Sequence, residues 1–262
     1  MINKIQFIYK YFHYYLTSQT KHDIHSPFVY DLVTKVFNCD KKLPLFNPIE
    51  SQRKFYLNDK NKIDIRDFGA GFGGIKYKQQ TVSYITGRSS KPQKYARLLY
   101  RLTNYLKPHN MLELGTSVGI SAVYQALGNS DGKLITIEGC ENTAAVAMKT
   151  FNALKTKNIT LVNDEFKKAL DTIFKEPIKI DYVFIDGNHR KEPTLNYFDQ
   201  CIKHAHPETV FIVDDINWSQ EMQNAWNEIK QHPKVSITIN IFMMGIVFIN
   251  PDFTKENFII RF

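Results

Sequence analysis

Apolar and polar residues alternate in blocks over residues 111–249, and the blocks predict an α/β fold. The short apolar runs have the length of buried strands, and helical spacing follows several of them. The predicted strands are 111–114, 133–137, 159–162, 180–185, 209–213, 235–239 and 245–249. Because very few residues separate the last two strands, these two must pair antiparallel. We therefore expect a mostly parallel, seven-stranded sheet that ends in an antiparallel hairpin.

Helical spacing dominates the chain before the first predicted strand and returns between the later strands. The predicted helices are 2–16, 28–37, 49–57, 93–106, 143–154, 165–174 and 217–230. Four glycines fall within residues 69–74, but the residues before them are half charged, so we expect a loop and not a phosphate-binding turn. The pattern predicts a helical N-terminal extension over residues 1–85, which caps the fold or recognises substrate, and an α/β domain over residues 86–262.

Charge is distributed unevenly along the chain. The net charge is +8, yet residues 1–110 hold 19 Lys and Arg against 7 Asp and Glu, a net charge of +12, and the remainder is net acidic. A basic segment favours an anionic partner such as nucleic acid, a lipid headgroup or a phosphorylated small molecule. A solvated basic surface is the alternative.

The cysteines and the N-terminus indicate a cytoplasmic protein. Cys39, Cys140 and Cys201 lie far apart, which argues against a disulfide scaffold or a zinc cluster. The chain starts without the layout of a signal peptide, and no apolar run approaches the length of a membrane span.

The strand at 111–114 leads into the most informative loop of the sequence. Gly115 and Gly119 lie four residues apart, and a helical run follows them, so the segment reads as strand, tight turn and helix. Glycine permits close approach of a ligand, and a helix N-terminus offers free N–H groups to polar groups. The spacing differs from that of dinucleotide-binding and P-loop motifs. An ordinary turn between strand and helix is the alternative.

An acidic residue at the end of the next predicted strand supports a nucleotide-binding site. Glu138 ends the strand 133–137, 23 residues beyond Gly115. In an open parallel sheet, an acid at this position can accept hydrogen bonds from both ribose hydroxyls of an adenosine ligand.

Together, the loop and Glu138 resemble motif I and its partner acid in class I S-adenosylmethionine-dependent methyltransferases. The resemblance implies a Rossmann-like fold and S-adenosylmethionine as methyl donor. Asp164 falls where the family contacts adenine, although Asn163 replaces the usual small residue and Asp164 could instead cap the next helix. The implied cofactor-binding residues are Glu113, Gly115, Thr116, Ser117, Gly119, Ser121, Glu138, Gly139, Asp164 and Asp186.

Further acids follow the strands 180–185 and 209–213. Asp186 ends the first of these strands, and Asp214 and Asp215 end the second. Parallel strands place these carboxylates at one sheet edge, where a cation or a proton must offset their repulsion. Carboxylate oxygens suit Mg²⁺ or a similar ion. Capping of a polar loop is the alternative for Asp214 and Asp215.

The segments Phe-Ile-Asp-Gly-Asn-His and Val-Asp-Asp are similar to those of metal-dependent O-methyltransferases, the catechol and caffeoyl-CoA types and the macrolide and aminocoumarin sugar types. The resemblance implies a metal site of Asp186, Asp214 and Asp215. It also implies catalytic roles for Asp186 and His189, with His189 at the position of the family's lysine base, where an imidazole can accept a proton near neutral pH.

The expected function is therefore O-methylation of a small hydroxylated, anionic acceptor with the help of a divalent cation such as Mg²⁺. Two rivals stay open. The basic segment fits an RNA or tRNA methyltransferase, although no Asn/Asp-Pro-Pro-Tyr motif is present. The chain could also be a non-catalytic adenosyl-binding protein that binds nucleic acid or a membrane. A homodimer is neither indicated nor excluded.

Overall fold

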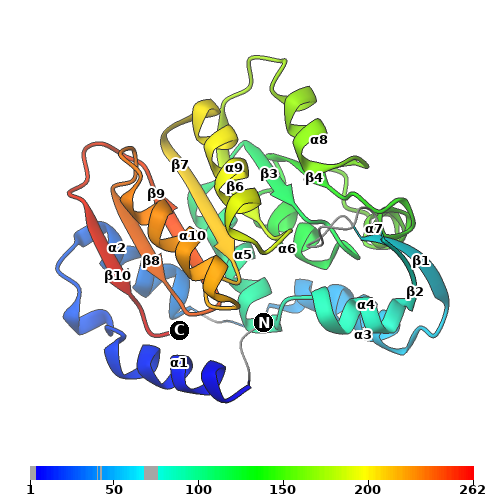
Figure 1. The fold of residues 1–262 in the computed structure, drawn as a ribbon, viewed down its shortest axis with the longest axis horizontal. Helices are drawn as coiled ribbons and strands as arrows, with labels where there is room; N and C mark the ends of the chain where they lie inside the picture. The colour runs from blue at the N-terminus through cyan, green and yellow to red at the C-terminus, as the bar shows by residue number, and fades with distance from the viewer. Residues whose placement is uncertain (1–3, 40, 42, 68–75) are drawn as a thin grey trace. The chain divides into compact units, whose positions relative to one another are not determined.

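The computed structural model describes residues 4–39, 41, 43–67 and 76–262 of the chain. These residues form two compact units (Figure 1). The first unit comprises Met1–Asn38 and Pro177–Phe262, and the second comprises Cys39–Glu176. The loop predicted over residues 69–74 lies outside the described residues.

The second unit contains the first half of the predicted α/β alternation. Three parallel strands pair in the order β3-β4-β5, and helices connect them because parallel neighbours need a crossover. The strands are β3 (Asn110–Leu114), β4 (Lys133–Ile137) and β5 (Ile159–Val162). The connecting helices are α6 (Ile120–Gly128) and α7 (Glu141–Ala153), while α5 (Gln93–Leu106) precedes β3 and α8 (Phe166–Ile173) follows β5. The bounds of α5, β4 and β5 are the predicted ones.

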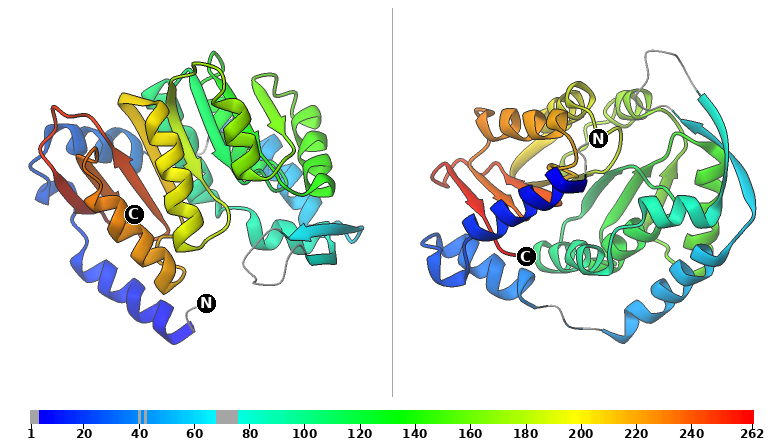
Figure 2. Two further views of the ribbon diagram at one scale, coloured as in Figure 1. Left: turned by 45° about the horizontal axis from the view of Figure 1, so that its top comes forward. Right: turned by 60° about the horizontal axis from the view of Figure 1, so that its bottom comes forward.

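The N-terminal part of the second unit is less helical than its sequence indicates. Helices α3 (Asn47–Asn58) and α4 (Val82–Ser89) flank an antiparallel pair, β1 (Lys62–Asp67) and β2 (Lys76–Thr81). Figure 2 shows these two strands in cyan from two further sides. The sequence analysis did not predict them, because the segments contain few apolar residues.

The first unit contains five strands in the order β10-β8-β9-β7-β6. The strands are β6 (Ile180–Ile185), β7 (Ala205–Asp214), β8 (Ile237–Asn240), β9 (Met244–Phe248) and β10 (Glu256–Ile259). The pair β6 and β7 is parallel, whereas β9 is antiparallel to both β7 and β8. The predicted antiparallel hairpin is therefore confirmed.

Helices cover both faces of strand β9. Trp226 of α10 (Gln220–Gln231) packs over Gly245, and Phe28 of α2 (Pro27–Leu32) contacts Phe248 with ring centroids 4.9 Å apart. Gly245 and Phe248 lie three residues apart on the strand, so they face opposite sides of the sheet. Helix α9 (Lys191–Cys201) packs beside α10 (Figure 1).

Helix α1 (Lys4–Thr17) is bound to the C-terminal end of the chain. The Tyr14 hydroxyl donates to the Ile260 carbonyl at 2.5 Å and accepts from the Phe262 N–H at 3.0 Å. The Tyr14 ring also contacts Phe242. Residues 33–37 extend α2 as a π-helical turn. Tyr14 therefore belongs to the core of the first unit, whereas most other aromatic side chains of α1, such as Tyr9 and Phe12, are exposed.

The predicted fold class is confirmed: an α/β fold with a mostly parallel sheet and an antiparallel C-terminal hairpin. Besides β1 and β2, strand β10, which pairs in parallel with β8, was not predicted. No helix within the described ranges has the length and apolar character that crossing a membrane requires.

We expect Tyr14→Phe to lower the free energy of unfolding by about 1–3 kcal/mol, because the Ile260 carbonyl and the Phe262 N–H lose their buried partner. Urea unfolding measures the change. Tyr9→Phe is the matched control, since Tyr9 lies on the same helix and is 69% exposed. Equal stability of the two variants would show that the Tyr14 hydroxyl does not hold α1 in place.

Candidate functional site

The loop between β3 and α6 has the tight backbone that its glycines predict. Gly115, Ser117 and Gly119 have φ values of 107°, 49° and 83°. A Cβ atom on Gly119 would also lie 2.7 Å from the Phe151 ring. A larger residue there would be strained both by its backbone and by its neighbour, so this position requires glycine.

Glu138 is held against this loop by backbone N–H groups. One carboxylate oxygen accepts from the Ser117 N–H at 2.8 Å, and the other accepts from the Cys140 N–H at 2.9 Å. Burial raises the pKa of Glu138, and hydrogen bonds from the backbone of Cys140, Ser117 and Gly139 act against that rise. The structure therefore brings the predicted ribose acid to the predicted loop and fixes its orientation.

Glu113 lies underneath the loop and is fully buried. Its carboxylate accepts from the side chains of Gln125 at 2.6 Å, Thr136 at 2.6 Å and Ser121 at 2.8 Å. The Thr136 hydroxyl also lies 2.6 Å from that of Thr116. Four residues of this network, Glu113, Ser121, Thr136 and Thr116, belong to β3, α6, β4 and the loop, so the network joins these four segments. Direct contact of Glu113, Thr116 or Ser121 with a ligand stays a prediction.

A pocket of about 260 Å³ adjoins the loop after Glu138. Its walls include Gly139, Cys140, Asn163 and Asp164, from the loops after β4 and β5. Asn163 donates to the Glu138 carbonyl at 2.6 Å. Asp164 accepts from the adjacent Glu165 N–H at 2.8 Å, but the N-cap residue of α8 is Glu165. The predicted adenine contact, Asp164, therefore lines a cavity beside the predicted ribose acid.

Most residues that line this pocket were not predicted from the sequence. They include Asp64 and Arg66 of strand β1, as well as Glu141, Asn142, Glu165 and Lys168. No local motif marks Asp64 and Arg66, because their strand has alternating charges and its pairing with β2 is visible only in three dimensions.

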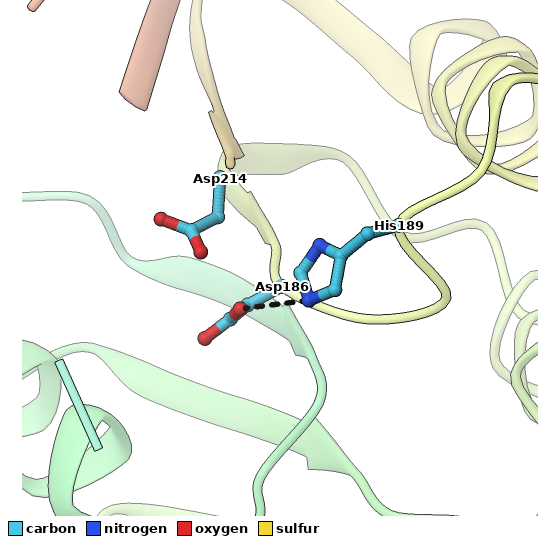
Figure 3. A group of neighbouring side chains, drawn as sticks. All are labelled: Asp186, His189 and Asp214. Carbon is cyan, nitrogen blue, oxygen red and sulfur yellow. Dashed lines mark ion pairs between the residues drawn. The ribbon is translucent and has the colours of Figure 1, made fainter. Parts of the chain in front are cut away.

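The acids in the first unit converge at the carboxyl ends of two parallel strands. Ile185 of β6 pairs with Val213 of β7, so Asp186, directly after β6, and Asp214, the last residue of β7, lie side by side. Figure 3 shows both carboxylates with the imidazole of His189. Ligand atoms of these three residues all lie within 4.8 Å of one another.

Asp215 reaches the same cluster through His189. The His189 Nε2 atom lies 3.7 Å from an Asp215 oxygen and 3.9 Å from an Asp186 oxygen. Both Asn188 and Asp215 have positive φ values, 52° and 54°, a conformation that Asn and Asp adopt more readily than most residues. These two turns orient His189 and Asp215.

The cluster fits a divalent cation. Carboxylate oxygens are the ligands that Mg²⁺ and Mn²⁺ prefer, whereas an imidazole nitrogen is more typical of transition metals such as Zn²⁺, and the three ligand atoms lie close enough together for a single ion. The third residue that lies close to Asp186 and Asp214 is His189, whereas the sequence predicted Asp215 as the third ligand. A protonated His189 could supply part of the same counter-charge, because it faces two of the acids.

The comparisons with known proteins concern mainly the central residues. Residues 112–216 match a protein family described as a methyltransferase domain. The catechol O-methyltransferase of Niastella koreensis is 29% identical over 123 residues, 46% of this chain. The match spans 55%, about half, of that relative's length.

Solved structures share the fold. The O-methyltransferase from Bacillus cereus, in complex with S-adenosylhomocysteine, is 23% identical with a TM-score of 0.54, covering 62% of this chain and 83% of that one. The S-adenosylhomocysteine-bound methyltransferase PaMTH1 of Podospora anserina is 11% identical with a TM-score of 0.61, covering 87% and 97%. The predicted resemblance to S-adenosylmethionine-dependent O-methyltransferases is confirmed.

We expect Glu113 to make stability depend on pH. Burial raises the pKa of Glu113 from 4.5 to about 7, so the folded state binds this proton more tightly than the unfolded state. Its stabilising contribution is full below pH 4.5 and is lost as the pH rises through 7, a loss of about 3 kcal/mol at a slope of about 1.4 kcal/mol per pH unit.

Glu113→Gln cannot ionise, so its free energy of unfolding should fall less than that of the unmodified chain between pH 5 and pH 8. Urea unfolding across this range measures the difference. The exposed Glu176→Gln is the control. Parallel pH profiles for all three proteins would contradict the raised pKa.

Proposed function

Because residues 112–216 match a methyltransferase domain, we propose that this chain transfers a methyl group from S-adenosylmethionine to a hydroxyl oxygen of a small anionic acceptor, with the help of a divalent cation. The observation that carries the proposal is the position of Glu138. Each of its carboxylate oxygens is fixed by one backbone N–H group, from Ser117 or Cys140.

This geometry suits a ribose. A carboxylate oxygen has two lone-pair directions, and one backbone N–H uses one of them. The Gly139 N–H makes a third hydrogen bond to this carboxylate, so one lone-pair direction stays open and can accept from a ribose hydroxyl. Because the backbone already orients the carboxylate, little side-chain freedom is lost when the donor binds.

The acidic cluster supports the acceptor half of the proposal. A divalent cation held by Asp186 and Asp214, with His189 or Asp215, would lower the pKa of an acceptor hydroxyl and so supply an oxyanion nucleophile. His189 has an imidazole nitrogen that can accept the hydroxyl proton, and Asp186 and Asp215 restrain its ring. If His189 is itself a ligand of the ion, the proton must leave to another group or to water.

Methyl transfer adds two requirements that the chain can meet. The sulfur, the methyl carbon and the acceptor oxygen must lie in line, so binding and orientation provide most of the catalysis. An anionic acceptor is also attracted by the basic segment, residues 1–110 with a net charge of +12. RNA meets the same charge requirement and therefore belongs among the acceptors tested.

We expect the full chain to bind S-adenosylhomocysteine in calorimetry. Glu138→Ala should weaken binding by about 1–3 kcal/mol, the scale of lost hydrogen bonds to a charged group. Glu176→Ala, which removes an exposed acid of the same unit, should leave the affinity unchanged. Equal affinity in both variants would contradict the assignment of the ribose to Glu138.

We expect methyl transfer to need both a cation and the acidic cluster. Radiolabelled donor, presented with small hydroxylated acids and with RNA fractions, identifies the acceptor class. Exhaustive chelation should then abolish transfer, and Mg²⁺ should restore it. Asp214→Asn should reduce kcat strongly and spare binding of S-adenosylhomocysteine, and His189→Ala should slow transfer by about 10² to 10⁴ if His189 is the base.

The chain offers a matched control pair for these variants. Asp181 and His206 also form an aspartate–histidine contact, at 2.7 Å, near the opposite ends of β6 and β7. Asp181→Asn and His206→Ala should keep full turnover. Unchanged turnover after chelation would contradict a catalytic cation and leave His189 to act as a base without metal.

A further inference from the structure

Strand β1 forms part of the wall of the pocket that adjoins Glu138. Asp64 and Arg66 line it, although both precede the residues 112–216 that match a methyltransferase domain. The remaining walls come from the segments after β4 and β5. One side of the cavity therefore consists of residues that lie outside the part of the chain that matches the methyltransferase-domain family.

The strand is tied to the residues that hold Glu138. The Arg66 N–H donates to the Cys140 sulfur at 3.3 Å, and the Asn142 side chain donates to the Asp64 carbonyl at 2.8 Å. Cys140 is also the residue whose N–H fixes one Glu138 oxygen. The position of Arg66 is thus coupled through one residue to the position of the proposed ribose acid.

We propose that β1 closes the base side of the donor pocket and that the Arg66 guanidinium covers the adenine ring of the donor. The inference rests on the proposed function, because it takes Glu138 as the ribose contact. In adenosine the base is attached to the ribose, and Gly139, the residue directly after Glu138, lines the pocket. A base attached to a ribose at Glu138 would therefore lie near this pocket. A volume of about 260 Å³ lies just under the usual range for whole ligands, about 300–1,000 Å³, and so suits the base portion alone.

The chemistry of the walls agrees with an adenine. A guanidinium is planar and weakly hydrated, and it stacks well on aromatic rings and bases. The carboxylate of Asp164 can accept from the exocyclic amine of adenine, which is a hydrogen-bond donor. Arg66 is half-buried and lines the pocket, so its side chain is partly restrained and adjoins the cavity.

This assignment gives part of the N-terminal segment a role in donor binding. The sequence alone associates residues 1–85 with capping or substrate recognition. Residues 62–67 instead become necessary for full affinity toward the donor, whichever acceptor the chain uses.

The test is calorimetry with two probes, S-adenosylhomocysteine and adenosine, on the full chain. Arg66→Ala should weaken both by the same factor, about 5-fold to 100-fold, the scale of a stacking contact with a base. Lys62→Ala is the matched control, because it removes an exposed cation from the same strand without touching the pocket. It should change neither affinity. Circular dichroism verifies that both variants fold.

The outcomes separate the inference from the proposed function. Failure of the unmodified chain to bind S-adenosylhomocysteine would overturn the proposed function and this inference with it. Binding by the unmodified chain with equal affinities for Arg66→Ala and Lys62→Ala would overturn the inference alone. A loss confined to S-adenosylhomocysteine, with adenosine unaffected, would also overturn it, because Arg66 would then contact the amino-acid portion.

If Arg66→Ala does not fold, hydrogen exchange on the unmodified chain tests whether β1 contacts the bound donor. Saturating S-adenosylhomocysteine should slow amide exchange in residues 62–67 and leave the exchange of α3, residues 47–58, unchanged. Unaltered exchange in residues 62–67 would overturn the inference.

Discussion

The proposed donor site depends on one buried carboxylate, that of Glu113. Burial of a charged group is costly unless hydrogen bonds compensate, and Glu113 receives three, from Gln125, Thr136 and Ser121. Because these partners lie on α6 and β4, the network fixes the segments that flank the loop. The loop in turn provides the Ser117 N–H that orients Glu138. Removing one partner would leave a buried polar group unsatisfied, so the network maintains the loop as a unit.

The acidic cluster follows from sheet geometry in the same way. Pairing of β6 and β7 in parallel register places Asp186 and Asp214 at adjacent strand ends, and the halves of the strands that lead to these ends are buried. The backbone thereby brings two carboxylates together before any ligand is present. Packing of strand side chains such as Phe184 and Phe211, which are fully buried, offsets the repulsion between the two carboxylates. The proposed cation would therefore meet carboxylates that the backbone already holds in place.

Sequence patterns predicted the parts of the fold whose local periodicity is strong. Helix α5 and strands β4 and β5 occur at the predicted residues, and the acids at strand ends follow from parallel pairing. Strands β1, β2 and β10 were missed, because their stability comes from partners distant in sequence and not from apolar alternation. The position of Glu113 beneath the loop and the contact of Asp215 with His189 depend on side-chain packing and backbone turns, which one sequence does not reveal.

Charge relates the two halves of the sequence to the two reactants of the proposed reaction. The methyl donor carries a sulfonium, and the proposed metal is a cation, so both suit the net acidic residues 111–262. The basic residues 1–110 suit an anionic acceptor. The proposed role of Arg66 would be an exception to this division, because a planar cation can bind the uncharged base of the donor by stacking. Net charge therefore selects the class of each reactant, whereas single side chains at short range decide which part of it they contact.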